Sequence, residues 1–589
     1  MATLKANFSL FPSFFPNVPS SRRVSSSWKR NYSASTTSGS FYCKLTQFPS
    51  SSASQLKPSL IHSDESSSNT GLAGFGASSN GTKGIEELVQ RVRRDMFINS
   101  GDPMRNLKLV DTLQRLGIAY HFDEEVNAVL DDVMSRRKRK NEEDDLFVTA
   151  LRFRLLRQNG YHVSPDDAFH KFINKEGKFQ EALSNDIVGM LSLYEVSYLG
   201  AKGEEILSEA MEFTKNNLRT SMPNLDLPLA REVGTALEVP RHLRMVRLEA
   251  RRYIDEYALK TAGSTVLVEL AKLDFNNIQL LHQMELAEVI RWWKELGLVE
   301  KLSFARDRPL ECFLWTVGIF PDPWHSKCRI ELTKTIAILL VIDDIFDSYG
   351  SIEELVLFNN AIQRWDLEAI EQLPEYMKIC YMALFNTTNE IGYRVFKEHG
   401  WSIIPHLKRT WIDMFEGFLV EAKWFNKKYV PTQEEHLVNG VTTAGTYMAL
   451  VHAFFLMGEG VTKETIKMME PYPMIFSHSG MILRLWDDLG TWREEQERGD
   501  VASSIECAMR EHINISSVDE ACDYIRQLIH NLWTELNGQL VAPEGLPLSI
   551  IKASLNLSRT SQVIYQQGYD NNASTVEDNI QLLLFRPIP

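Results

Sequence analysis

Residues 336–347 read IAILLVIDDIFD, and this stretch decides what kind of protein the chain forms. Seven apolar residues lead directly into Asp343 and Asp344, and Asp347 follows closely. If the run forms a buried helix, Asp343 and Asp347 stand at i and i+4 and project from one face. Carboxylates at the end of an apolar helix are costly to leave unpaired, and Mg²⁺ is a hard cation that takes such oxygen ligands. A solvated helix end or an N-cap would account for the same acids, so this stretch alone does not establish a metal site.

A second acidic segment, residues 483–495 (LRLWDDLGTWREE), favours the metal site. Asp487, Thr491 and Glu495 follow one another at intervals of four residues. On a helix this spacing puts two carboxylates and a hydroxyl in one oxygen-rich row. Arg484 precedes them on roughly the same face, where a guanidinium could bind a phosphate. The two segments together therefore indicate a site for a metal ion and a phosphorylated ligand.

These segments resemble the two metal motifs of the plant terpene synthases, DDxxD and (N,D)Dxx(S,T)xxxE. Further stretches match family signatures: Arg306-Asp307-Arg308 with Glu311 and Trp315, residues 113–122 (LQRLGIAYHF), residues 247–251 (RLEAR) and residues 364–366 (RWD). The resemblance runs from about residue 85 to the C-terminus. It implies an all-α protein with an N-terminal α-barrel-like relict domain and a C-terminal class I terpenoid synthase α-bundle.

The N-terminal segment has the composition of a targeting peptide. Residues 1–63 contain 17 serines, seven of the 63 basic residues and no acid. Ser-rich, basic and acid-free sequence is typical of an organellar transit peptide, and the resemblance favours the plastid over the mitochondrion. Residues 64–83 are interpreted as a low-complexity linker.

Helical patterning begins at about Gly84 and predicts two domains. Residues 84–262 form the first, and residues 263–589 form the metal-binding catalytic domain. Neither Asp131-Asp132 nor Asp144-Asp145 belongs to a DxDD motif, the acid of protonation-initiated terpene cyclases. The N-terminal domain is therefore expected to be non-catalytic.

Composition excludes several other classes of protein. Beyond residue 63 the chain carries 56 basic and 77 acidic groups, a net charge of −21, which argues against nucleic-acid binding. The chain contains no run of 18 apolar residues, so the sequence does not predict a membrane span. The six cysteines show no CxxC pair and predict neither a zinc site nor a disulfide framework. The chain has no Gly-rich phosphate loop and no GxSxG nucleophile elbow.

The resemblance implies a prenyl diphosphate substrate and Mg²⁺ (or Mn²⁺) as cofactor, three ions being the number typical of the family. It assigns the metal to Asp343, Asp347, Asp487, Thr491 and Glu495. It assigns the diphosphate to Arg306, Arg308 and Arg484 together with Asp343, Asp347 and Asp487. Asp344 points elsewhere on the helix and is expected to anchor an arginine.

A carbocation formed by loss of diphosphate needs a dry, π-rich cavity. Trp315 and Tyr565 match family positions that line this cavity, and an ordinary core aromatic is the less favoured alternative for each. Gly445, in Thr442-Thr443-Ala444-Gly445-Thr446, is interpreted as a helix break that aims carbonyl groups at the cation.

Three departures from the family pattern bear on the product. Many cyclising monoterpene synthases carry RRx8W, but Pro103 stands where Arg93-Arg94 would require the tryptophan. The family associates that motif with isomerisation of geranyl to linalyl diphosphate before ring closure. The usual YxHGDG and its following aromatic are replaced by residues 565–571, YQQGYDN, which end on Asn571. Ser503 replaces a lysine often found near the diphosphate.

These features predict a monomeric terpene synthase that makes an acyclic alcohol. Linalool from geranyl diphosphate, by water capture at C3, is favoured, and farnesyl diphosphate would give nerolidol in the same site. Capture at C1 would give geraniol, and deprotonation would give myrcene or ocimene. A chain-elongating prenyltransferase would carry two DDxxD motifs, whereas the second motif here is DDxxTxxxE. A non-enzymatic helical scaffold is the remaining alternative.

Overall fold

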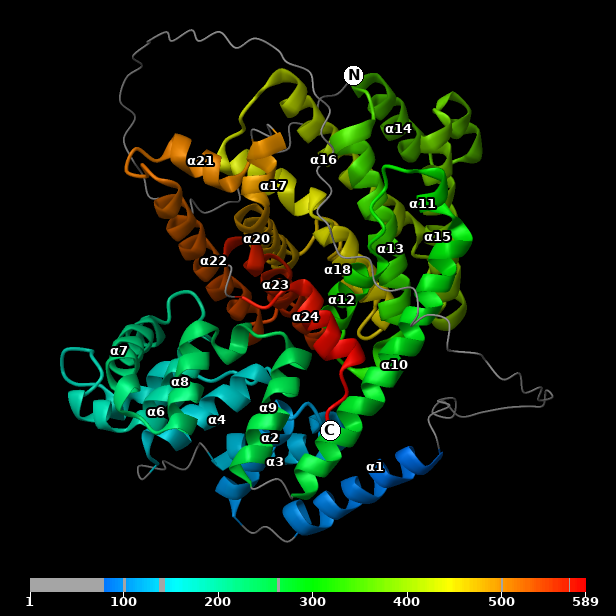
Figure 1. The fold of residues 1–589 in the computed structure, drawn as a ribbon. Coiled ribbons are helices and arrows are strands. Elements are labelled where there is room, and N and C mark those ends of the chain that lie inside the picture. The colour runs from blue at the N-terminus through cyan, green and yellow to red at the C-terminus, as the bar shows by residue number, and fades with distance from the viewer. Residues whose placement is uncertain (1–78, 99–101, 137–143, 262–264, 499–501, 571–572) are drawn as a thin grey trace. The chain divides into compact units, whose positions relative to one another are not determined.

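The computed structural model describes residues 79–98, 102–136, 144–261, 265–498, 502–570 and 573–589. The predicted transit peptide, residues 1–63, lies outside this part of the chain. Within it the regular elements are helices, and the β-structure consists of one isolated bridge between Ile173 and Phe179. The predicted all-α class is confirmed (Figure 1).

The first half of the described chain contains nine α-helices, counted between the gaps given above. They are α1 (Ser79–Val92), α2 (Pro103–Arg115), α3 (Asp123–Arg136), α4 (Leu146–Gln158), α5 (Pro165–Phe169), α6 (Ile187–Ser197), α7 (Glu205–Ser221), α8 (Leu227–Glu238) and α9 (Val246–Lys260).

The second half begins with the long helix α10 and carries both acidic motifs. Its helices are α10 (Val266–Leu296), α11 (Leu298–Lys301), α12 (Pro309–Ile319), α13 (Ser326–Asp344), α14 (Ile352–Arg364), α15 (Glu375–His399), α16 (Ile404–Lys427), α17 (Gln433–Thr443), α18 (Thr446–Met457), α19 (Lys463–Lys467), α20 (Met474–Arg498), α21 (Ser504–Glu511), α22 (Val518–Val541), α23 (Leu548–Tyr569) and α24 (Val576–Ile580). Two π-helical turns extend α13 and α24: η8 (Ile345–Tyr349) and η10 (Gln581–Phe585).

Helix ends follow from local sequence. α10 starts where the side chain of Thr265 accepts a hydrogen bond from Val268 N, and it ends at Gly297, whose φ of +60° suits glycine. α14 starts with a capping box in which Ser351 and Glu354 bond each other's backbone N–H groups. These caps satisfy backbone groups that the helix itself leaves unpaired.

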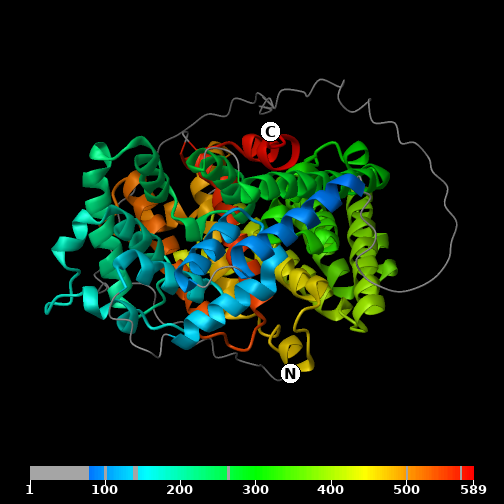
Figure 2. The ribbon, with the colours of Figure 1, turned by 90° about the horizontal axis from the view of Figure 1, so that it is seen from below.

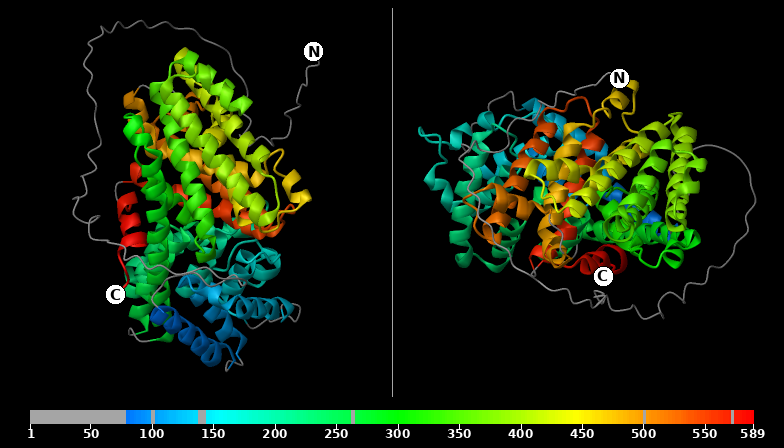
Figure 3. Two further views of the ribbon diagram at one scale, coloured as in Figure 1. Left: turned by 90° about the vertical axis from the view of Figure 1, so that its right-hand side faces the viewer. Right: turned by 90° about the horizontal axis from the view of Figure 1, so that it is seen from above.

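Buried apolar side chains join elements that are distant in sequence. One cluster combines residues of α1–α4 with Phe275 on α10, Phe313 on α12 and Leu584 on η10. α1 packs along α10 (Figure 2), and the C-terminal segment lies beside α10 (Figure 3). There, Gln283 Nε2 donates to Leu584 O at 2.5 Å. Two further clusters surround α13 and α20, respectively, and hold the helices that carry the acidic motifs.

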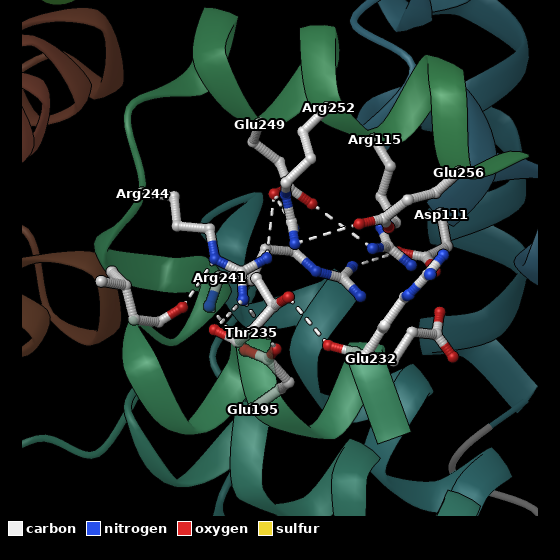
Figure 4. A network of polar contacts seen from close by, with 12 residues as sticks. Asp111, Arg115, Glu195, Glu232, Thr235, Arg241, Arg244, Glu249, Arg252 and Glu256 are labelled. Carbon is white, nitrogen blue, oxygen red and sulfur yellow. Dashed lines mark hydrogen bonds and ion pairs between the residues drawn. The ribbon is translucent and has the colours of Figure 1, made fainter. Parts of the chain in front are cut away.

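The N-terminal helices also enclose a polar network rich in arginine (Figure 4). Asp111 accepts from Arg154 Nη2 at 2.8 Å and from Arg241 Nη1 at 2.7 Å. Burial would raise the pKa of Asp111, but these arginines hold it well below its usual range. Glu249 lies among Arg244 and other arginines, which lower its pKa to about 2 against the effect of burial. These acids are engaged in ion pairs that tie the helices together.

Helical residues lie on both sides of the predicted segment boundaries at residues 84 and 263. α1 begins at Ser79, inside the predicted linker 64–83. The sequence placed the start of the helix later because the apolar repeat that signals it begins only at Ile85. α9 ends at Lys260 and α10 begins at Val266, on either side of the predicted boundary at residue 263. One hydrophobic cluster runs across that boundary, so the division at 263 remains a prediction.

The cysteines and the most apolar helical segment are buried within the described residues. The five cysteines there are free and buried. The segment Gln433–Met457 is long and apolar enough to cross a membrane, but 72% of its most apolar window is buried inside the protein, as in a core helix. It is also divided at Gly445 into α17 and α18.

Candidate active site

The first acidic motif lies where α13 changes its winding. α13 ends at Asp344, and η8 continues it as a π-helical turn in which Gly350 N donates to Ile345 O at 2.8 Å. Asp343 is partly buried and Asp347 is exposed. The apolar run forms the buried helix expected from the sequence, but the α-helical spacing assumed between Asp343 and Asp347 passes into i→i+5 bonding after Asp344. Single π-turns are frequent at functional sites.

Arg306 contacts both adjoining aspartates of this motif. Its backbone N donates to Asp344 Oδ2 at 2.9 Å, and its Nε pairs with Asp344 Oδ1 at 2.6 Å. Its Nη2 donates to Asp343 Oδ2. Burial alone would lower the pKa of Arg306, but Asp343 and Asp344 raise it, so the guanidinium stays charged. Asp344 thus has an arginine as its partner, as expected from the sequence.

The second acidic motif lies on α20. Arg484 Nη1 donates to Asp487 Oδ2 at 2.7 Å, and Arg484 Nη2 donates to Thr443 Oγ1 of α17 at 3.2 Å. Thr491 Oγ1 lies 2.6 Å from Glu495 Oε1 and 2.8 Å from the carbonyl oxygen of Asp487. The structure therefore brings Thr491 and Glu495 into contact and places Asp487 one turn away on the same helix.

Asp488 is the acid of this motif that points into the protein. It is 1% exposed, and its Oδ2 accepts from Ser504 N at 2.8 Å and lies 2.7 Å from His436 Nε2. Burial would raise the pKa of Asp488, but His436, Arg484 and the bond from Ser504 lower it. Sequence analysis missed His436 because it stands 52 positions from Asp488, and no spacing pattern connects them.

The two acidic motifs influence each other. Burial raises the pKa of Asp487 to about 6; Asp488 and Asp343 add to the shift, and Arg484 opposes it. Burial also raises the pKa of Glu495 to about 8, and Asp488 and Asp487 add to it. Since the charge of Asp343 affects the pKa of Asp487, the motif on α13 and the motif on α20 lie close enough to interact electrostatically.

These raised pKa values indicate that the acids suit a cation. Burial makes the charged form of each carboxyl costly, the neighbouring carboxylates add to that cost, and a divalent cation bound between them would offset it. In the described part of the chain, no three His, Cys, Asp or Glu side chains are grouped tightly enough to hold an ion on their own. Mg²⁺ fits such a set, since it typically takes one or two carboxylates and completes its shell with water and substrate phosphates.

Trp315 on α12 and Tyr565 on α23 lie beside the second motif. Their ring centroids are 6.1 Å apart, with an interplanar angle of 59°. Burial raises the pKa of Tyr565 well above its usual value, and Asp487, which accepts a hydrogen bond from the phenol, adds to the shift. Both rings are only partly buried, unlike a core aromatic such as Phe313. Their role beside a carbocation remains a prediction.

Other residues singled out in the sequence lie in different settings. Gly445 separates α17 from α18 with a φ of +77°, so the predicted helix break is confirmed. Arg308 is exposed at the N-cap of α12. Ser503 is buried and caps α21, where its hydroxyl accepts from Glu506 N at 3.3 Å. Asn571 lies outside the described residues.

Two protein-family models match the sequence that forms these helices and motifs. Residues 60–237 match the terpene synthase N-terminal domain, and residues 294–535 match the metal binding domain of the terpene synthase family. The second match contains Arg306, both acidic motifs and Thr443.

Similar proteins come from flowering plants. The chain is 63% identical over 505 residues to "Probable terpene synthase 11" of Ricinus communis, which covers 86% of this chain and 87% of that protein. It is 53% identical over 534 residues to the chloroplastic geraniol synthase of Ocimum basilicum, covering 90% of each. It is 51% identical over 510 residues to the chloroplastic R-linalool synthase of Ocimum basilicum, covering 86% of this chain and 87% of that protein.

A solved structure with the same fold contains metal. Isoprene synthase from grey poplar, in complex with three Mg²⁺ ions and dimethylallyl-S-thiolodiphosphate, superposes with a TM-score of 0.81 at 36% identity. The alignment covers 87% of this chain and 98% of that chain. The metal-binding domain match and this neighbour support the use of a divalent metal by the present chain.

The chain therefore belongs to the terpene synthase family. Its fold is the two-domain α-helical fold of that family. Within the family its relatives are plant monoterpene synthases, and those from Ocimum basilicum are named chloroplastic. The names agree with the plastid localisation predicted from residues 1–63.

Proposed function

We propose that this chain ionises geranyl diphosphate and releases an acyclic monoterpene alcohol, linalool, by capture of water at C3 of the allylic cation. The observation that carries the acyclic product is Pro103, which stands where the RRx8W motif of many cyclising relatives requires tryptophan. Without that motif, the isomerisation that precedes ring closure loses support. Farnesyl diphosphate in the same site would give nerolidol.

Three Mg²⁺ (or Mn²⁺) ions are the proposed cofactor. The proposed ligands are Asp343 and Asp347 at the end of α13, and Asp487, Thr491 and Glu495 on α20. When bound, the ions neutralise the diphosphate leaving group so that the allylic C–O bond can break without a protein nucleophile. The raised pKa values of Asp487 and Glu495 support this assignment, because burial and neighbouring carboxylates disfavour their charged forms and a bound cation would favour them.

Arg306 and Arg484 are the proposed ligands of the diphosphate, and Arg308 adds positive charge from the surface. Arg306 is held by Asp344, and Arg484 is held by Thr443. A held guanidinium matches phosphate geometry and retains the diphosphate after it departs. The partly buried rings of Trp315 and Tyr565 are proposed to stabilise the cation that remains.

Geraniol is the second candidate product. The geraniol synthase and the R-linalool synthase of Ocimum basilicum are 53% and 51% identical to this chain, and these values do not favour one product over the other. Geraniol requires only that water attacks C1 of the same allylic cation. Myrcene and ocimene would follow if the cation lost a proton before water arrived.

The proposal extends to the organisation of the protein. Residues 263–589 are proposed to be the metal-binding catalytic domain and residues 84–262 a non-catalytic helical domain, and the protein is proposed to be a monomer. The ion pairs of Asp111 and Glu249 with arginine support the second point, since they leave those acids engaged in structural contacts.

Gas chromatography of the products tests the proposal. Purified residues 64–589 are incubated with Mg²⁺ and either geranyl or farnesyl diphosphate, and the products are separated on a chiral phase. Linalool as the main product from geranyl diphosphate is the expected result. Geraniol would favour the second candidate, and limonene, pinene or cineole would overturn the acyclic assignment.

A further inference from the structure

Arg484 is held by Asp487 on its own helix and by Thr443 on α17, and Thr443 is in turn bonded to Glu421 on α16. On α20, Asp487 Oδ2 accepts from Arg484 Nη1 at 2.7 Å. On α17, Thr443 Oγ1 accepts from Arg484 Nη2 at 3.2 Å and donates to Glu421 Oε1, on α16, at 2.8 Å. Because Thr443 gives its only hydroxyl proton to a carboxylate, its lone pair is directed to the guanidinium.

Glu421 is the far end of this series of contacts. Its Oε1 also accepts from Asn439 Nδ2 at 3.0 Å, and Asn439 Nδ2 lies 3.1 Å from Gly417 O. Burial raises the pKa of Glu421, and the positive charge of Arg484 is the largest opposing influence. Glu421 therefore acts on Arg484 both through the Thr443 hydroxyl and through its charge.

Gly440 makes room for the stem of the same arginine. A Cβ atom at position 440 would lie 2.9 Å from Arg484 Cγ and 2.9 Å from Arg484 Nε, closer than side-chain atoms normally pack. Gly440 lies inside α17, where alanine would be the better helix former. Glycine at this position therefore lets Arg484 lie directly against the helix.

From this geometry we infer that Glu421, Thr443 and Gly440 are positioning residues that set the Arg484 guanidinium for the diphosphate before the substrate binds. The inference rests on the role proposed above for Arg484. A guanidinium fixed in advance loses little rotamer freedom when the ligand arrives, which strengthens binding. None of the three residues needs to touch the reacting atoms for this effect.

The test measures Mg²⁺-dependent binding of inorganic pyrophosphate to the purified full chain by calorimetry, with kcat and KM for geranyl diphosphate measured in parallel. Thr443→Val removes the hydroxyl at nearly constant volume and is expected to weaken pyrophosphate binding about tenfold and to raise KM by a similar factor. Thr443→Ser keeps the hydroxyl and is expected to retain binding. Gly440→Ala is expected to weaken binding about tenfold, although alanine favours the helix.

A matched control distinguishes an effect on the position of Arg484 from the general effect of removing a buried hydroxyl group. Thr214 is fully buried on α7, where its Oγ1 donates to Ala210 O at 2.6 Å. Thr214→Val makes the same chemical change in the N-terminal helices and is expected to leave pyrophosphate affinity unchanged. An equal loss of affinity in Thr214→Val and Thr443→Val would overturn the inference.

Arg484→Ala distinguishes failure of the inference from failure of the proposed function. If Arg484→Ala weakens pyrophosphate binding while Thr443→Val and Gly440→Ala do not, the inference is wrong and the role of Arg484 stands. If Arg484→Ala binds pyrophosphate normally, both are wrong. When Thr443→Val is added to Arg484→Ala, no further loss is expected, because the threonine acts through the arginine. A second tenfold loss in that double variant would refute positioning.

Discussion

Replacement of Arg329 by methionine should destabilise the protein strongly without touching its acidic motifs. Arg329 is 0% exposed in the first turn of α13, the helix that ends in Asp343 and Asp344. Its Nε and Nη2 each donate to Glu285 of α10 at 2.7 Å. Its Nη1 donates to Phe320 O at 2.8 Å and to Asp322 O at 2.6 Å. The side chain thus joins α10, the end of α12 and the start of α13.

The expected size of the effect follows from these contacts. Arg329→Met leaves the Glu285 carboxylate buried without a partner, which costs about 3–5 kcal/mol, and leaves two carbonyl groups without a donor, each worth about 1 kcal/mol. We therefore expect a loss of about 5 kcal/mol in the free energy of unfolding. Arg329→Met with Glu285→Leu replaces both charges by apolar groups and should recover more than about 2 kcal/mol of this loss.

Urea unfolding followed by tryptophan fluorescence measures these differences. Measurement at pH 8 keeps His282 neutral, since burial and the nearby Arg329 lower the pKa of this histidine in the intact protein. Without Arg329, a protonated His282 at lower pH could supply the missing charge. A loss below about 1 kcal/mol in the single variant, or a double variant as unstable as the sum of both changes, would refute the reasoning.

Three further outcomes are expected. Asp343→Ala should abolish product formation in Mg²⁺ with an unchanged circular dichroism spectrum, and normal turnover would remove Asp343 from the proposed ligands. Deletion of residues 1–63 should preserve activity in vitro, whereas a fluorescent protein fused behind those residues should enter plastids; a cytosolic signal would contradict the predicted localisation. Burial lowers the pKa of His242 to about 3, below its unfolded value of about 6.5. The unfolded state therefore binds the proton first, and stability should fall as the pH drops below about 6.5, by about 2 kcal/mol at pH 5 from this group. His242→Gln, compared with the unmodified chain by thermal unfolding at pH 5 and pH 8, should show less of this loss, and an identical pH dependence would contradict the assignment.

The sequence predicted those features of the site that are local along the chain. Asp487, Thr491 and Glu495 lie on one helix, so helical spacing alone anticipated their arrangement on α20. The apolar run before Asp343 likewise predicted the buried helix α13. Gly445 was correctly interpreted as a break because glycine readily adopts positive φ.

Features that depend on packing between distant segments could not be predicted. The composition of the π-helical turn η8 after Asp344 does not distinguish it from an α-helix. The bond between His436 and Asp488 and the contacts of Thr443 with Arg484 join α17 to α20, and no short motif connects these positions. The residues that hold the motifs in place were therefore visible only in the structure.

The crossing of α20 and α23 limits how this protein could acquire a different product. A side chain at Gly568 would meet the carbonyl oxygen of Gly490 at 2.1 Å, and one at Gly490 would meet the carbonyl oxygen of Tyr565 at 2.7 Å. The two backbones are in contact there, so a side chain at either glycine would push α20 and α23 apart and displace the second acidic motif from Tyr565. Reshaping the site around a longer or folded substrate must therefore come from side chains on other helices, such as α12. Directed evolution for a new product should accumulate changes on those helices and leave both glycines unchanged.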